Sequence, residues 1–442
     1  MPVTTAYKRC LVLRTDFTQN CVTSLDNKFS LELQLPLLMT TRQIRVLDNN
    51  VAKMSKVSLP PECFFKPMNF PHKILMGPGP SNCPPRVLEA SALPMLGPLH
   101  PEFTMIMDEV KAGIKYIFQT NNEWTVCVSG SGHAAMETAC LNLLEPWDTA
   151  LVGINGLWGE RFADMVQRQG IDVKKIHRPM GEVFTLEEIE EALKKHKPTL
   201  LFLTHGESTG STLQPLEDVG TLCHKYNCLL LVDSVGACGG VPMFMDKWEI
   251  DCLYTGAQKV LSAPPGASPI SFSKRAKEKV KKRVSPIRSF NFDMNHLANY
   301  WGCDGDVRRY HHTGPISCIY AIREGLAVLA EQGLEESWKK HKHCAELLHE
   351  GLEKIGLELL VKDKSIRNPC VTAVKVPDGV DWKAVIEYTR KTYRVEIGAG
   401  LGALAGKVWR IGVMGYNCTP DNVRLVLRAL EEGLRMTRTA KL

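Results

Sequence analysis

The sequence predicts an α/β fold, with a large domain built on a mostly parallel sheet and a smaller C-terminal α/β domain. From about residue 73 onward, short apolar runs alternate with helix-length amphipathic stretches, which is typical of strands joined by helices. The chain has 442 residues, more than one hydrophobic core usually organises. We expect an N-terminal extension and arm over 1–72, the large domain over 73–333 and the small domain over 334–442.

Helical periodicity is clearest in three segments. Residues 103–118 and 134–144 place apolar side chains on one face, so each predicts a helix with a buried stripe. A longer helical pattern from Ile319 to Lys354 is interrupted near Gly333, where we expect the small domain to begin.

The predicted strands are continuously apolar, which indicates strands covered on both faces. They are Thr125–Val128, Thr149–Val152, Leu200–Leu203, Leu229–Val232 and Cys252–Tyr254. In open α/β sheets ligands bind beyond the carboxyl ends of the strands, so the residues that follow these runs are the candidates for chemistry.

Composition argues against several classes of function. The net charge of +6 is mild, and no basic block is interleaved with aromatic residues, so we expect no nucleic-acid partner. The densest basic stretch, residues 273–283, is interpreted as a solvated helix face. The 15 cysteines include no C-x-x-C pair, so we expect neither a metal site nor a redox dithiol. Every apolar run is too short to span a membrane.

Both ends of the sequence resemble targeting signals. Lys8, Arg9 and Arg14 precede any acidic residue and weakly resemble a mitochondrial presequence, although acidic residues follow further on. Met39 and Met54 are alternative translation starts to Met1, and the sequence leaves open which of the three is used. The C-terminal residues 440–442, Ala-Lys-Leu, are a variant of the Ser-Lys-Leu peroxisomal signal. We expect a peroxisomal import receptor as partner and the peroxisome as the main location, with mitochondrial targeting as a second route.

An aspartate and a lysine follow neighbouring predicted strands. Asp233 comes directly after Val232, and Lys259 closes the loop after Tyr254. Pyridoxal phosphate requires a lysine amine for its Schiff base and a carboxylate beside its pyridine nitrogen. Either residue alone is more often structural, a helix cap or a solvated lysine, but the pair predicts a pyridoxal 5′-phosphate site.

A glycine-rich turn lies between a strand and a helix at Ser129–His133. Its backbone N–H groups at a helix N-terminus favour a phosphate. Residues 130–135 also fit a loose dinucleotide fingerprint, but the acidic residue expected about 20 positions on is not clearly placed, so that alternative stays open. Trp158, after the next strand, suits a flat ring stacked on a cofactor, or else a core position.

Two further motifs belong to the same sheet edge. Residues 204–210 offer small hydroxyl donors after a strand. Arg410 interrupts the otherwise apolar run Val408–Met414, and its planar guanidinium matches the carboxylate of an amino acid. A structural salt bridge is the competing explanation for Arg410.

Together these motifs resemble the class V pyridoxal-phosphate-dependent aminotransferases, and within them most closely the alanine:glyoxylate (serine:pyruvate) branch. The matching segments are Leu75–Asn82, Ser129–His133, Asn155–Gly159, Leu203–Ser208, Leu231–Ser234, Ile250–Lys259, Gly266–Ile270, Trp301–Asp304 and Tyr310–Thr313. The resemblance runs from about residue 55 to the C-terminus and departs from the family pattern at 208–212 and 236–238.

The resemblance implies a fold-type I PLP-transferase and a role for each matched residue. Lys259 would form the Schiff base and move the proton, and Asp233 would hold the pyridine nitrogen. Trp158 would stack on the ring, Ser208 would contact its substituents, and Arg410 would bind the substrate carboxylate. The residues implied around the phosphate are Ser131, Gly132, His133 and Gln258, with Tyr310 and Thr313 donated by the other subunit of a homodimer.

The implied reaction is a ping-pong transfer of the amino group of alanine or serine to glyoxylate or pyruvate, within glyoxylate detoxification. The implied partners are therefore small amino acids and 2-oxo acids, and no metal is expected. Alternatives are another class V activity, such as 3-hydroxykynurenine transamination or cysteine desulfuration, a dinucleotide-dependent oxidoreductase, and a noncatalytic protein with the same fold.

Overall fold

The structure, a computed structural model, describes Ser58 and residues 60–439. The chain divides into two units, Met1–Phe70 and Pro71–Leu442. The described part of the first unit holds one short 3₁₀ helix, η2 (Glu62–Phe65). The predicted presequence, the alternative starts and the Ala-Lys-Leu tail lie outside the described residues.

The second unit contains a seven-stranded sheet in the order β2-β10-β9-β8-β5-β3-β4. Its strands are β2 (Trp124–Gly130), β3 (Thr149–Ile154), β4 (Asp172–His177), β5 (Leu200–Thr204), β8 (Leu229–Asp233), β9 (Cys252–Tyr254) and β10 (Gly266–Phe272). Five neighbouring strands, β9, β8, β5, β3 and β4, run parallel, while β10 is antiparallel to both β2 and β9. The predicted α/β fold class with a mostly parallel sheet is confirmed.

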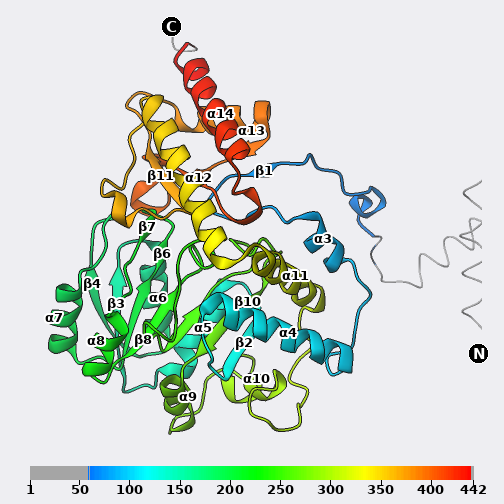
Figure 1. The fold of residues 1–442 in the computed structure, drawn as a ribbon, viewed down its shortest axis with the longest axis vertical. Helices are drawn as coiled ribbons and strands as arrows, with labels where there is room; N and C mark the ends of the chain where they lie inside the picture. Colours follow the sequence, from blue (N-terminus) through cyan, green and yellow to red (C-terminus); the bar gives the residue numbers. More distant parts are fainter. Residues whose placement is uncertain (1–57, 59, 440–442) are drawn as a thin grey trace, which may run out of the picture. The chain divides into compact units, whose positions relative to one another are not determined.

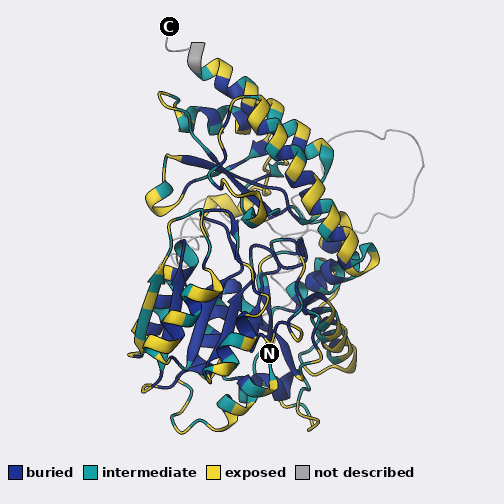
Figure 2. Cartoon of the chain, turned by 60° about the vertical axis from the view of Figure 1, so that its left-hand side comes forward, coloured by how far each residue is buried: buried dark blue, intermediate teal, exposed yellow. Residues whose placement is uncertain are grey.

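The strands are buried because helices cover the sheet. All residues of β5, β8 and β9 are buried, as their continuous apolarity predicted, and these strands are dark blue in Figure 2. The sequence did not predict β4 or β10. Strand β4 at the edge of the sheet carries charged residues, and β10 contains Pro269 and two serines.

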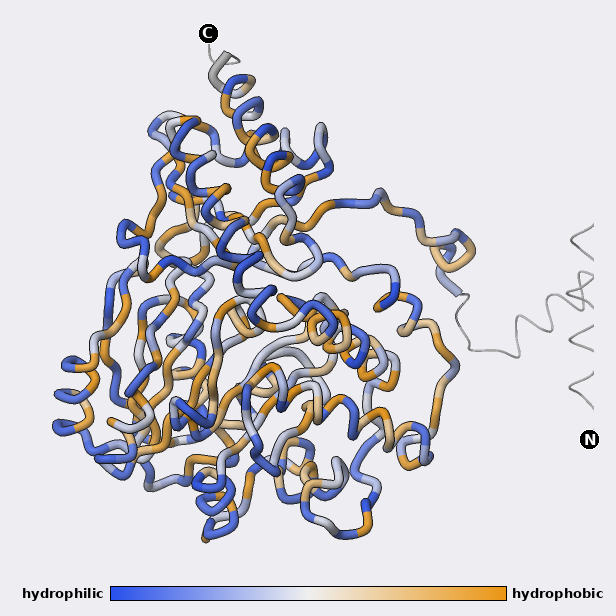
Figure 3. The backbone as a smooth tube through the Cα atoms, in the orientation of Figure 1, coloured by the Kyte–Doolittle hydropathy of each residue, from blue (hydrophilic) through white to orange (hydrophobic). Residues whose placement is uncertain are grey.

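Helices connect and flank these strands (Figure 1). They are α3 (Pro85–Ser91), α4 (Pro101–Phe118), α5 (Gly132–Leu143), α6 (Leu157–Arg168), α7 (Leu186–His196), α8 (Val219–Lys225), α9 (Lys274–Lys281), α10 (Met294–Tyr300) and α11 (Ile316–Gln332). The predicted helix at 134–144 begins earlier, because Ser131 takes the extended N-cap position and Gly132 already belongs to the first turn. In Figure 3 the outer helix α7 is mostly hydrophilic, whereas the strands beside it carry hydrophobic stretches.

The C-terminal part has a hydrophobic cluster of its own. A three-stranded antiparallel sheet, in the order β11-β14-β13, packs with three helices. These elements are β11 (Val371–Lys375), β13 (Gly398–Ala399), β14 (Val408–Gly412), α12 (Leu334–Lys354), α13 (Trp382–Tyr393) and α14 (Pro420–Thr439). The predicted interruption of the long helix is real, because Gly333, at φ 82°, separates α11 from α12. The proposed division at residues 333 and 334 stays a prediction.

Short elements complete the second unit. The two-residue strand β1 (Ile74–Leu75) pairs in parallel with β12 (Val395–Glu396), and β6 (Gly206–Glu207) pairs with β7 (Thr212–Leu213). The remaining 3₁₀ turns are η3 (Lys364–Ile366), η4 (Gly402–Leu404) and η5 (Gly415–Asn417). In the part of the chain that the structure describes, no helix is long and apolar enough to cross a membrane.

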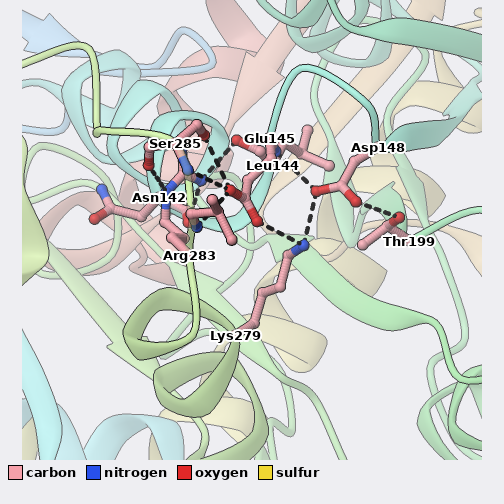
Figure 4. Close-up of polar contacts among 9 residues, drawn as sticks. Asn142, Leu144, Glu145, Asp148, Thr199, Lys279, Arg283 and Ser285 are labelled. Carbon is pink, nitrogen blue, oxygen red and sulfur yellow. Dashed lines mark hydrogen bonds and ion pairs between the residues drawn. The ribbon is translucent and has the colours of Figure 1, made fainter.

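A buried polar cluster anchors the C-terminal end of α5 (Figure 4). Arg283 donates to the carbonyls of Asn142 at 2.9 Å and Leu144 at 2.7 Å, which satisfies free carbonyls at the end of the helix. The Glu145 carboxylate accepts from the Val284 and Ser285 N–H groups, both at 2.9 Å, and Lys279 lies 3.4 Å from its other oxygen. The cluster therefore fixes one end of the helix whose other end opens toward the candidate site.

Candidate active site

A pocket lies at the carboxyl ends of β2, β3, β5, β8 and β9. The space between its walls, part of it open to solvent, is about 530 Å³. Its lining residues are Ser131, Gly132, His133, Met136, Trp158, Gly206, Ser208, Asp233, Val235, Gly236, Gln258 and Lys259. Eight of the residues predicted from sequence therefore lie together, namely Ser131, Gly132, His133, Trp158, Ser208, Asp233, Gln258 and Lys259.

The N-terminus of α5 forms one wall of the pocket. Ser131 is the N-cap, and no side chain caps the helix, so its first-turn N–H groups are available to an anion. His133 follows in the first turn, and its Nε2 lies 2.8 Å from the Arg161 guanidinium nitrogen NH1. Burial, and then the Arg161 charge, lower the pKa of His133, so the imidazole is held neutral with Nε2 as an acceptor.

Trp158 and Ser208 reach the pocket from two neighbouring loops. The Trp158 indole Nε1 donates to the Ser208 hydroxyl at 2.9 Å. The indole also meets the His133 ring edge-on, with 5.6 Å between the ring centroids. These contacts hold the flat face of the indole at the pocket, where a planar ligand can stack on it.

Asp233 ends β8 at the floor of the pocket, and both its carboxylate oxygens have protein donors. Oδ1 accepts from the Val235 N–H at 2.9 Å, and Oδ2 accepts from the Tyr254 hydroxyl at 2.8 Å. Burial raises the pKa of Asp233 to about 6, although both hydrogen bonds and the Lys259 charge oppose the rise. A cationic group placed in the pocket beside this carboxylate would be strongly favoured.

Lys259 lies on the loop after β9 and faces the same space. Its ammonium donates to the Pro78 carbonyl, which belongs to the matched segment Leu75–Asn82. Burial, and then the Arg410 charge, lower the pKa of Lys259 to about 8. A substantial fraction of the amine is therefore neutral near pH 8 and able to attack a carbonyl carbon.

Arg410 lies in β14 and is 6% exposed, and it does not line the pocket wall. Its Nε donates to the Ala399 carbonyl at 2.8 Å, and its NH1 donates to the Ser208 carbonyl at 3.0 Å. Among the described residues, no carboxylate lies within ion-pair distance of this guanidinium. Arg410 is therefore not half of a direct salt bridge within the described residues, although the buried Glu207 carboxylate lies near enough for its charge to oppose the lowering of the Arg410 pKa by burial.

Tyr310 and Thr313 are not among the pocket residues. They lie on the segment between α10 and α11, where their side-chain oxygens are 3.1 Å apart, and Tyr310 is 59% exposed. Their neighbour His312 does reach this end of the sheet, with Nε2 at 2.5 Å from the Ser129 hydroxyl. Within one chain the structure does not bring Tyr310 and Thr313 to the pocket.

Sequence reasoning missed two buried polar residues beneath the pocket. One is Tyr254, which pairs with Asp233 across the parallel strands β8 and β9. One predicted strand ended just before Asp233 and the next ended at Tyr254, and that shared position could have indicated a contact between the two side chains. The other is Glu207, which accepts from the Thr209 and Gly210 N–H groups, both at 2.7 Å. It fills the space beside Gly156, where an added Cβ would lie 2.0 Å from the carboxylate carbon. Glu207 therefore braces the Ser208 loop through two backbone hydrogen bonds and packs against the Trp158 loop at Gly156.

These features fit one cofactor. An uncapped helix N-terminus, a flat indole, a buried carboxylate and a lysine of lowered pKa surround one cavity. The side-chain oxygen of Gln258, on the same wall, is buried without a hydrogen-bond partner, so no contact stops the amide group from turning its N–H donors toward a phosphate. The fold and the site together define a pyridoxal-phosphate-dependent enzyme of fold type I.

Comparison with known proteins identifies the family within this class of enzymes. The family model described as "Aminotransferase class-V" matches residues 75–425. The chain is 53% identical to an alanine–glyoxylate aminotransferase of Callithrix jacchus over 383 residues, covering 87% of this chain and 92% of the relative. A Drosophila melanogaster protein of the same name is 46% identical, covering 86% and 96% of the two chains.

Solved structures with a similar fold belong to proteins of related names. The alanine–glyoxylate aminotransferase of Nostoc sp. superposes with a TM-score of 0.83 at 45% identity, covering 86% of this chain and all of the other. The ureidoglycine–glyoxylate aminotransferase of Bacillus subtilis gives a TM-score of 0.81 at 35% identity, covering 84% and 95%. This chain belongs to the class V aminotransferases, which use pyridoxal 5′-phosphate, and the dinucleotide alternative is thereby set aside.

Proposed function

We propose that the protein is an alanine:glyoxylate aminotransferase that also handles serine and pyruvate and serves glyoxylate metabolism. The observation that carries the proposal is the buried Arg410, which forms no direct ion pair with any described residue and lies close enough to Lys259 to lower the pKa of its amine. A 2-amino acid and a 2-oxo acid share the feature this pair recognises, a carboxylate next to the reacting carbon. The relatives named alanine–glyoxylate aminotransferase, at 46–53% identity, supply the choice of substrates.

Each residue has a defined task in this proposal. When bound, pyridoxal phosphate accepts the electron pair that an amino acid releases when it loses its α-proton. Arg410 orients the substrate carboxylate, and the Lys259 amine removes and returns the α-proton. Asp233 keeps the pyridine nitrogen protonated, while the α5 N-terminus and Gln258 hold the phosphate. Burial of Lys259 and Asp233 keeps bulk water away from the reacting atoms.

Two other class V activities are the alternatives. Cysteine desulfuration requires a mobile cysteine at the substrate, and none of the described residues that line the pocket is a cysteine. 3-Hydroxykynurenine transamination requires room for a bulky side chain, which only substrate comparison tests.

The experiment is a side-by-side assay of the purified holoenzyme with alanine or serine as donor and glyoxylate or pyruvate as acceptor. Parallel reactions with 3-hydroxykynurenine and with cysteine, scored for loss of 3-hydroxykynurenine and for sulfide release, cover the alternatives. The proposal expects alanine and glyoxylate to give the highest kcat/KM. Greater activity with 3-hydroxykynurenine, or sulfide release, would overturn it.

We also propose a homodimer in which Tyr310 and Thr313 complete the partner's phosphate site. Their exposure supports it, as does an apolar surface around them. His311, next to Tyr310, stacks on the ring of Phe290, with 4.9 Å between the ring centroids. Exposed apolar side chains therefore occur on and beside this segment. These exposed side chains are Met105, Phe290 and Val307.

For location, we propose import into the peroxisome through Ala440-Lys441-Leu442, with mitochondrial targeting by the N-terminal segment as a second route. The match of the tripeptide to a peroxisomal signal and the peroxisomal origin of glyoxylate support the first route. Imaging of a chain tagged at an internal loop, with and without the last three residues, tests the proposal. Unchanged location after their removal would contradict it.

A further inference from the structure

Packing alone does not explain why residue 254 is a tyrosine and not a phenylalanine. Tyr254 ends the short strand β9, is fully buried, and follows the apolar residues Cys252 and Leu253. Phenylalanine would fill the same space. The polar atom that distinguishes tyrosine donates a 2.8 Å hydrogen bond to Oδ2 of Asp233.

The geometry of this contact comes from the sheet. Strands β8 and β9 run parallel with Asp233 directly opposite Tyr254, so the two side chains leave neighbouring strands at the same level. The hydroxyl donates to one carboxylate oxygen, and the Val235 N–H donates to the other. The carboxylate is thus held from both sides, while Asp233 still faces the pocket.

We propose that Tyr254 is a positioning residue that keeps Asp233 ionised and oriented toward the pyridine nitrogen of the cofactor. The inference rests on the role of Asp233 given under the proposed function. A hydrogen bond from a neutral hydroxyl stabilises the carboxylate more than the carboxylic acid. An ionised Asp233 in turn stabilises a protonated ring nitrogen, which is the state that withdraws electrons from the substrate.

Few other groups can take over this task. The charge of Lys259 lowers the pKa of Asp233, but the Lys259 amine takes part in the proposed reaction itself. His205, at the end of β5, bonds Ser234 rather than Asp233, and burial lowers its pKa to about 3, so it carries no charge. Cys252, two residues before Tyr254 on β9, is itself buried, and burial raises the pKa of its thiol, so it offers no charge.

The test compares Tyr254→Phe with Asp233→Asn in binding two ligands to the apoprotein. One ligand is pyridoxal phosphate, and the other is its 1-deaza analogue, in which a C–H group replaces the ring nitrogen. Loss of the hydroxyl should weaken pyridoxal phosphate binding about tenfold below about pH 6, where the variant has a smaller fraction of ionised Asp233, with little change near pH 8, and should leave analogue binding unchanged. The acid limb of the binding profile should move to higher pH by about one, because Asp233 then takes up its proton more readily.

The outcomes separate the possible failures. If Tyr254→Phe weakens both ligands equally, or neither, while Asp233→Asn weakens only pyridoxal phosphate, the role of Asp233 stands and that of Tyr254 is wrong. If Asp233→Asn also changes the affinity for the two ligands equally, the proposed role of Asp233 fails as well. Far-ultraviolet circular dichroism and thermal unfolding of both variants confirm that the fold is kept.

Discussion

Asp233 illustrates how a residue can be functional at a cost to the folded chain. Burial raises the pKa of its carboxyl to about 6, so the folded apoprotein holds this proton more tightly than the unfolded chain does. The contribution to stability is fully present below about pH 4 and is lost as the pH rises through about 6. At neutral pH an ionised Asp233 therefore destabilises the apoprotein, and a cationic group bound beside the carboxylate would offset this loss of stability.

Asp233→Asn should accordingly stabilise the apoprotein while it destroys activity. We expect the free energy of unfolding near pH 8 to rise by about 1–2 kcal/mol, and kcat to fall about 100-fold or more. Urea unfolding at pH 8 and pH 5 measures the first effect, which should shrink at pH 5. A variant that is less stable than the parent at pH 8 would contradict this explanation.

Arg410 is the second residue on which the proposed reaction depends. Arg410→Ala should weaken the binding of a carboxylate substrate by about 2–5 kcal/mol, because the substrate charge then enters a desolvated site without its partner. Arg410→Lys is the matched control, since it keeps the charge and loses the planar fork. Steady-state kinetics with alanine would show the effect chiefly in KM, and unchanged kinetics in Arg410→Ala would remove the assignment.

The sequence identified the residues that carry charge or chemistry next to a strand end, because parallel strands bring those ends to one edge. Asp233 and Lys259 were predicted in this way. Tyr254 and Glu207 were missed because each looks like an ordinary strand or loop residue until the neighbouring element is known.

At the scale of elements, the two ends of helix α5 differ. Its N-terminus has no side-chain cap and opens to the pocket, whereas Arg283 caps its C-terminal carbonyls beside the Glu145 cluster. Burial alone would raise the pKa of Glu145, but the hydrogen bonds from Ser285 and Val284 outweigh it and lower the pKa to about 2. Glu145 therefore contributes stability that is present above the unfolded pKa of about 4.3 and is lost as the pH falls toward 2.

Glu145→Gln should lower the free energy of unfolding by about 2–3 kcal/mol at neutral pH, because the variant loses charged hydrogen bonds in a buried cluster. The difference from the parent should narrow as the pH falls below about 4. Glu123→Gln is the control, because Glu123 pairs with Lys277 at the surface and is 70% exposed. Equal losses in the two variants, measured by urea unfolding, would speak against the anchoring role of the cluster.

Most helices and the buried parallel strands were predictable, since 3.6-residue stripes and continuous apolar runs are local signals. The antiparallel strand β10 was not, because its pairing with β2 and β9 is decided by partners far away in the sequence. The same reason hides the Glu145 cluster, whose members come from two segments far apart in the sequence, 142–148 and 279–285.

At the scale of the whole molecule, the proposed dimer makes a prediction that one chain cannot satisfy. If Tyr310 acts on the partner's site, chains with Lys259→Ala and chains with Tyr310→Ala should restore one intact site when they form a mixed dimer. Co-expression should then recover about a quarter of the parent activity, because about half the dimers are mixed and each has one intact site. No recovery in verified mixed dimers would mean that Tyr310 does not act across the interface.

The central claim is that Lys259 holds the cofactor at the edge of the sheet, and its most direct test is borohydride reduction followed by peptide mapping. The purified protein should show a visible absorbance band that disappears on reduction, with a pyridoxyl group then fixed to the peptide that contains Lys259. A protein that stays colourless after incubation with pyridoxal phosphate, or one labelled at another lysine, would contradict the claim.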